Sequence, residues 1–276
     1  MTPAGRDRLA GVLLGVAPVA ALMLVALVVV GVGLDGAPEV HAAFLTEAPT
    51  QAGRSGGIAP MLAATAWVLV IGIGTALPPG LAAAVYLAEF AQGGTRMVRV
   101  ALDVLAALPS VVYGLFGMAF FCELLGFGWS VLAGGLTVAI MILPLFVRLC
   151  EAALVAVPAD YRAAGAALGL PRWRLLGRVL LPAASPSIAA ALVLASGRVL
   201  AESAVFLFTA GASTRTPHGL LEPGRVLAVH IYQLAVEVPG GGARAAATAL
   251  VLLVGIVATT SGAALLPQLL LRRTAA

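Results

Sequence analysis

Two ionisable residues, Arg198 and Glu202, interrupt an apolar stretch that is long enough to lie in a membrane. A charge near the centre of a bilayer costs at least about 2.5–3.5 kcal/mol, so such residues usually have a partner or a function. Four residues separate the two, which places both on one face of a helix, where they can neutralise each other. The planar guanidinium of Arg198 can bind phosphate oxygens through two parallel hydrogen bonds. The sequence therefore allows two interpretations: an oxyanion-binding pair in a transport pathway, or an ion pair that only holds a helix bundle together.

Two hydroxyl groups, on Ser110 and Tyr113, follow Pro109 in another apolar stretch. They are candidates for donors to the same substrate just beyond a proline kink. The alternative is helix packing, where small polar residues are common. His41, His218 and His230 lack the spacing of metal ligands, and we predict no metal site.

The composition indicates a membrane protein. Of 276 residues, 61% are hydrophobic and 10% are charged, whereas soluble proteins average about 25% charged residues. Because about 20 apolar residues span a bilayer as a helix, we predict an all-α polytopic protein with six transmembrane helices. These spans cover residues 9–34, 58–88, 100–122, 124–147, 182–211 and 245–271. The first run exceeds the roughly 7–15 apolar residues of a signal peptide, so we expect it to be retained.

The arginines are divided unequally between the two sides of the predicted spans. Eleven lie on one side: Arg6, Arg8, Arg96, Arg99, Arg148, Arg162, Arg172, Arg174, Arg178, Arg272 and Arg273. Four lie on the other: Arg54, Arg215, Arg225 and Arg244. Positive residues accumulate on the cytoplasmic side, so both termini are predicted to be cytoplasmic. The arginines are scattered at span ends, a pattern that does not indicate nucleic-acid binding.

The sizeable polar insertion between spans four and five is predicted to contain a short cytoplasmic helix. Pro158 and Asp160 form a helix-start signal, and Gly169-Leu170-Pro171 a stop signal. The helix is rich in Ala and Gly, with Tyr161 and Leu168 as its large apolar residues. Small side chains allow close approach, so it suits the groove of a partner protein. The alternative is a surface helix that merely joins two spans.

The spacing of this insertion resembles the EAA loop of bacterial ABC importer permeases. That loop reads Glu-Ala-Ala, three residues, Gly, nine residues, then Ile, any residue and Leu-Pro, and it forms a coupling helix that docks on the ATPase. The matching positions in this chain are Ala163, Ala164, Gly165, Gly169 and Pro182. Ala163 replaces the Glu of the motif and Gly165 its second Ala. A literal Glu-Ala-Ala begins at Glu151, but Val157 stands where that register needs Gly.

Further segments resemble the phosphate-specific (Pst) importer, and specifically its A-type permease. They are VYLAEF at 85–90, LPSVVYGLF at 108–116, GRVLAESA at 197–204 and LFTA at 207–210. This chain departs from the family pattern at three positions: it has Ala201 where the family has Gly, Ser203 where the family has Thr, and Val205 where the family has Pro. The resemblance adds Ser203 to the pathway residues, beside Arg198, Glu202, Ser110 and Tyr113.

The resemblance implies a type-1 (MetI-like) ABC permease fold with an N-terminal helix and external loop at 1–57, the transmembrane domain at 58–271 and a coupling loop at 150–181. It implies transport of inorganic phosphate across the bacterial plasma membrane, with three kinds of partner: a C-type permease subunit, a cytoplasmic ATPase dimer and an external phosphate-binding protein. The chain has no Walker A motif, so no enzymatic activity and no cofactor of its own are expected, and the partner uses ATP. A permease for another oxyanion stays open as an alternative. So does an ion-driven secondary transporter in which Arg198 and Glu202 form a proton-linked pair.

Overall fold

A computed structural model of the chain describes residues 3–91 and 93–274, with side-chain surroundings for 15–91 and 93–261. The helices are α1 (Pro3–Gly36), α2 (Ala42–Thr46), α3 (Ala59–Val85), α4 (Arg96–Ala107), α5 (Ser110–Gly117), α6 (Val131–Val155), α7 (Ala159–Ala167), α8 (Arg172–Leu175), α9 (Leu181–Leu200), α10 (Ala204–Thr209), α11 (Leu227–Val236) and α12 (Gly242–Thr274). Strands β1 (Pro49–Thr50) and β2 (Ser55–Gly56) form an antiparallel pair with Pro49 opposite Gly56. Short 3-10 helices, η1 (Ala37–Glu39) and η2 (Gln51–Gly53), complete this segment.

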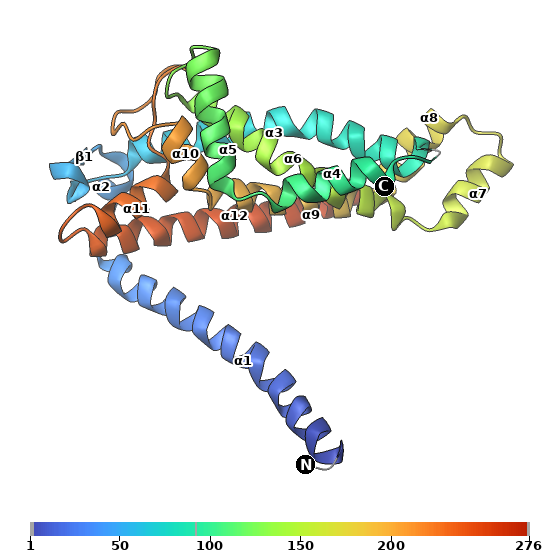
Figure 1. The fold of residues 1–276 in the computed structure, drawn as a ribbon, viewed down its shortest axis with the longest axis horizontal. Coiled ribbons are helices and arrows are strands. Elements are labelled where there is room, and N and C mark those ends of the chain that lie inside the picture. Colours follow the sequence, from blue (N-terminus) through green and yellow to red (C-terminus); the bar gives the residue numbers. More distant parts are fainter. Residues whose placement is uncertain (1–2, 92, 275–276) are drawn as a thin grey trace.

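The molecule is a helix bundle with the small elements gathered at its two ends (Figure 1). Helices α3, α6, α9 and α12 run along its length, α7 and α8 lie at one end, and β1, α2 and α11 lie at the other. In the described part of the chain, five helices are long and apolar enough to cross a membrane, and the bent pair α4–α5 can supply a sixth. The all-α membrane fold and the number of spans agree with the sequence prediction.

The third span, predicted over residues 100–122 with a kink at Pro109, is broken there more sharply than a kink. It breaks between α4 and α5 with a bend of 92°. Leu108 is extended (ψ 139°), as expected for a residue that precedes proline. The Tyr113 hydroxyl donates to the carbonyl oxygen of Leu105 across the bend, at 2.8 Å. A π-helical turn, η4 (Met118–Leu124), then extends α5 to Leu124.

The fourth and fifth spans are also displaced from their predicted bounds. Because η4 continues to Leu124, α6 begins only at Val131, where the Ser130 side chain caps it by accepting from the Ala133 N–H at 3.1 Å. Pro144 is accommodated inside α6, so the helix continues to Val155. The fifth span runs from Arg172 to Leu200 through α8, the π-helical η5 (Leu176–Leu180) and α9. It ends before the predicted Gly211, because a break at 201–203 separates α9 from α10.

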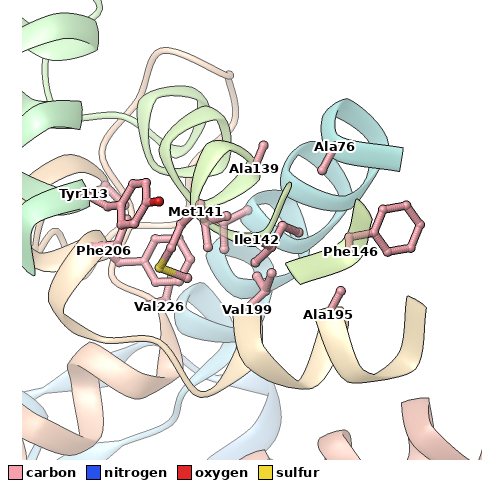
Figure 2. Packing of buried hydrophobic residues seen from close by; sticks show 14 of the residues in the cluster. Ala76, Tyr113, Ala139, Met141, Ile142, Phe146, Ala195, Val199, Phe206 and Val226 are labelled. Carbon is pink, nitrogen blue, oxygen red and sulfur yellow. The ribbon is translucent and has the colours of Figure 1, made fainter. Parts of the chain in front are cut away.

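The core lies where α3, α6 and α9 meet. Figure 2 shows Ile142 and Phe146 of α6, Ala76 of α3, and Ala195 and Val199 of α9 in this cluster. Glycines bring α3 and α6 together: a Cβ on Gly135 would lie 2.5 Å from Ile71, and one on Gly80 would lie 2.7 Å from Phe146. Small residues commonly allow such close packing between membrane helices.

Helix α1 extends away from the bundle (Figure 1). Residues 15–30 are exposed along its length. Its C-terminal end contacts α12, where a Cβ on Gly36 would lie 2.6 Å from the backbone of Ala246. The Arg244 guanidinium nearby pairs with Glu39 at 3.0 Å and donates to the Gly56 carbonyl at 2.9 Å. The first helix is therefore attached at one end, and the domain division at residue 57 stays a prediction.

Candidate translocation pathway and coupling site

The Arg198 and Glu202 side chains are neighbours, as the spacing predicts. Arg198 Nη2 lies 3.5 Å from Glu202 Oε2. Arg198 belongs to the last turn of α9, and Glu202 lies in the break that follows it, where its N–H donates to the Val199 carbonyl at 3.2 Å. The two side chains are placed differently: Glu202 is buried, while Arg198 is 51% exposed. About half of the Arg198 side chain is therefore left accessible, while a buried carboxylate lies beside its guanidinium.

Ser203 lies directly after this pair and lines a small hollow. The hollow has a volume of about 250 Å³ and is bounded by α5, α10 and α11, with Ser203, Val111 and Tyr232 among its walls. Helix α5 packs on α10, since a Cβ on Gly114 would lie 3.2 Å from the Ala204 carbonyl oxygen. The structure thus brings Arg198, Glu202 and Ser203 together beside α5.

Ser110 and Tyr113 occupy a more structural position. Ser110 is the first residue of α5 and is partly buried. Tyr113 is buried, and its hydroxyl group donates a hydrogen bond to the Leu105 carbonyl oxygen. No hydrogen bond joins either residue to Arg198 among the side chains that the structure describes. Their role as substrate donors stays a prediction, and Tyr113 has a visible function in stabilising the bend.

The polar insertion between α6 and α9 forms the predicted helix, α7. It begins at Ala159 after Pro158, and Gly169 follows its end in the left-handed region at φ 65°. Tyr161, Ala163 and Ala164 are exposed, as a docking face requires. Gly165 is buried, because a Cβ there would lie 2.6 Å from Cδ1 of Leu175 on α8. The absence of a side chain at this motif position therefore lets α7 pack closely against Leu175. Pro182 is exposed at the start of α9.

Arg162 forms a cluster that sequence reasoning did not find. Its Nη2 lies 2.6 Å from Oε1 of Glu89, in the π-helical turn η3 (Tyr86–Phe90) that extends α3. The same guanidinium donates to the carbonyl oxygens of Leu154 and Val157, each at 2.9 Å. The acidic partner is 73 residues away in the chain, so no local pattern indicates the pair. We call these four residues the Arg162 cluster.

A second set of charges joins α4 to α6. Glu151 is buried and accepts from Arg99 at 2.7 Å and from Arg148 at 2.8 Å. Arg148 also contacts the exposed Asp103 at 3.0 Å. Glu151, whose literal Glu-Ala-Ala does not fit the loop motif, is thus the centre of an ion-pair network.

We expect Glu151→Ala to lower the stability of the chain more than Asp103→Ala. The first substitution removes the buried acceptor that Arg99 and Arg148 share, although both arginines keep another acceptor. Both are also about one-third exposed, so water offsets part of the loss. A cost of about 1–3 kcal/mol is expected for Glu151→Ala, and at most about 1 kcal/mol for the exposed Asp103. Thermal unfolding in detergent measures both, and equal shifts in Tm for the two variants would contradict this assignment.

At the opposite end of the bundle, His230 of α11 is buried outside the membrane-spanning helices. Its Nδ1 lies 3.3 Å from Nη1 of Arg225, which also donates to the Ala212 carbonyl oxygen. Burial and then the Arg225 charge lower the pKa of His230 to about 4. His230 is therefore neutral at pH 7, and its burial is a tertiary effect that its position in the sequence does not reveal.

Acidification is expected to destabilise this end of the molecule. The unfolded chain takes up a proton on His230 as the pH falls below about 6.5, whereas the folded chain resists until about 4. The free energy of unfolding therefore decreases, by up to about 3 kcal/mol, as the pH is lowered from about 6.5 to about 4. Thermal unfolding at pH 7.5 and 5.0 should show a smaller pH effect for His230→Gln than for the wild type. His218→Gln, at an exposed position, is the control, and an unchanged pH effect in His230→Gln would contradict the assignment.

Comparison with known proteins identifies the family of this fold. Residues 76–270 match the family described as "Binding-protein-dependent transport system inner membrane component". The "Probable ABC transporter permease protein YqgI" of Bacillus subtilis is 35% identical over 73% of this chain and 74% of its own length. The "Phosphate transport system permease protein PstA" of Xylella fastidiosa is 30% identical over 72% of this chain and 70% of its own length.

Solved structures resemble the fold at lower identity. A bacterial alginate ABC transporter in complex with an alginate pentasaccharide-bound periplasmic protein matches with a TM-score of 0.61 and 16% identity, over 94% of this chain and 93% of that one. An inward-facing MetNI methionine ABC transporter matches with a TM-score of 0.58 and 20% identity, over 77% of this chain and 93% of that one. The predicted type-1 ABC permease fold is confirmed. The chain belongs to the family of binding-protein-dependent transport system inner membrane components.

Proposed function

We propose that this protein is a permease subunit of an ATP-driven importer of inorganic phosphate and forms half of the translocation pathway. The observation that carries the proposal is the half-exposed Arg198 held by the buried Glu202. A guanidinium matches two phosphate oxygens and keeps its charge at every physiological pH. Relatives named as phosphate transport permeases support the choice of substrate.

The pair suits transport better than tight storage of the anion. Glu202 neutralises Arg198 when the pathway is empty, and the 3.5 Å separation is longer than a strong charge-assisted hydrogen bond of about 2.7–2.9 Å. Phosphate can therefore replace this contact without first breaking a short one. A conduction site has to bind its substrate weakly enough to release it.

The exposed groups of this subunit support three partners. A cytoplasmic ATPase dimer docks on α7 through Tyr161, Ala163 and Ala164, which are exposed. A C-type permease subunit covers the open side of Arg198 and completes the pathway. An external phosphate-binding protein delivers substrate to the opposite end, where a hollow of about 850 Å³ is lined in part by Arg215 and His218. The unequal distribution of arginines supports cytoplasmic termini.

The source of energy tests this proposal against a secondary transporter. Phosphate uptake is measured in cells that express the chain with its partner subunits, after loss of the ATPase and after treatment with an uncoupler. We expect uptake to stop without the ATPase and to continue for at least a short period with the uncoupler. Uptake that survives loss of the ATPase but collapses with the uncoupler would instead assign Arg198 and Glu202 to proton coupling. Competition by other oxyanions tests the substrate in the same assay.

A further inference from the structure

The Arg162 cluster connects the helix predicted to dock on the ATPase with two membrane-spanning helices. Arg162 lies in α7, Glu89 in the extension of α3, and Leu154 at the last turn of α6. All three guanidinium nitrogens have acceptors: Nε and Nη2 face Glu89, Nη1 faces Val157, and Nη2 also faces Leu154. One side chain of α7 thus contacts two other elements, the extension of α3 and the last turn of α6.

The geometry of the cluster makes this connection stiff. The last carbonyl groups of a helix have no partner within the helix, and Arg162 supplies donors to Leu154 in the last turn of α6 and to Val157 just beyond it. The guanidinium is planar, so its donors have a fixed relative direction. Both side chains are largely shielded, with 30% of Arg162 and 15% of Glu89 exposed. Water therefore competes less with these contacts than it does at the surface.

We propose that Arg162 is a positioning residue that transmits movement of α7 to the cytoplasmic ends of α3 and α6. The inference rests on the proposed function, because it assumes that an ATPase moves α7. Gly165 adds a contact from the same helix to Leu175 on α8, the segment that leads into α9. Helix α7 is thereby attached to three spans, and Arg162 provides the charged part of that attachment.

Charge reversal tests the proposal in the assembled transporter. Arg162→Glu and Glu89→Arg each place like charges together, and the double variant restores an opposite pair. We expect each single variant to lower phosphate uptake at least about tenfold while ATP hydrolysis by the same complex falls less than about twofold. The double variant should recover part of the uptake. Arg174→Glu is the matched control, since it makes the same charge change on an exposed arginine of α8.

A second measurement is independent of transport and of substrate. Limited chymotrypsin digestion of the purified full-length chain reports how firmly α7 is held, because Tyr161 and Leu168 are exposed cleavage positions. We expect at least about fivefold faster cleavage in each single variant, and slower cleavage in the double variant than in either single one. The inference would be overturned if both single variants keep the wild-type rate of cleavage and the wild-type ratio of ATP hydrolysed to phosphate taken up. A double variant no better than the single ones would overturn it as well. Wild-type protein that takes up no phosphate contradicts the proposed function alone, and the digestion rates still decide this inference.

Discussion

Replacing Arg198 by alanine is expected to lower phosphate uptake at least about 100-fold while the complex still assembles. Two charge-assisted hydrogen bonds at roughly 1.5 kcal/mol each correspond to a factor of this size. Assembly should survive because the Arg198 side chain is half-exposed and makes one long contact with Glu202 in this chain. The measurement is uptake of radiolabelled phosphate by cells that express the variant at the wild-type level, with co-purification of the ATPase as the check on assembly.

Arg198→Lys separates charge from geometry. Lysine keeps the positive charge but has no planar fork, so we expect an intermediate loss of about tenfold. Arg54→Ala, at an exposed position just after η2, is the control and should leave uptake unchanged. If Arg198→Ala transports normally, the pair only stabilises the bundle, and the pathway has to be sought elsewhere.

Replacing Gly165 by leucine is expected to abolish coupling between ATP hydrolysis and transport. Leu175 already occupies the space at 2.6 Å from a Cβ on Gly165, so a large side chain has to push α7 away from α8. The atom that is hit is the end of a flexible side chain, so Gly165→Ala should be tolerated with less than about a threefold loss of uptake. A methyl group needs a smaller shift than an isobutyl group, and overpacking costs typically about 1–3 kcal/mol.

The coupling ratio is the readout for Gly165→Leu. ATP hydrolysis and phosphate uptake are measured on the same reconstituted complex, and uptake should fall at least about tenfold more than hydrolysis. Gly177→Leu is the matched control, because a Cβ there meets nothing within 4 Å. Equal effects of leucine at the two glycines would show that the contact with Leu175 is unimportant.

The sequence predicted the parts of this structure that depend on local pattern. Long apolar runs predicted the spans, and the signals at Pro158 and Gly169 predicted α7 to within two residues of its observed end at Ala167. The spacing of Arg198 and Glu202 predicted their ion pair. The bend at Pro109 was expected as a kink, but a local proline signal does not specify its size, 92°.

The charge networks were not predicted, for a physical reason. Glu151 and Arg99 are 52 residues apart in the chain, and Arg162 and Glu89 are 73 apart. Local periodicity says only which face of a helix is apolar, and these contacts depend on how α3, α4 and α6 are placed. The sequence also did not predict that Arg198 is half-exposed. The exposure of a side chain depends on how the helices are placed relative to one another, which a single sequence does not specify.

Reconstitution tests the central claim most directly. Proteoliposomes that contain this chain, its partner permease and the ATPase are loaded with ATP or with a non-hydrolysable analogue and supplied with radiolabelled phosphate and the external binding protein. Phosphate should accumulate with ATP, stop accumulating with the analogue, and fail to accumulate when Arg198 is alanine. Accumulation driven by a proton gradient without ATP, or of another oxyanion in place of phosphate, would contradict the account.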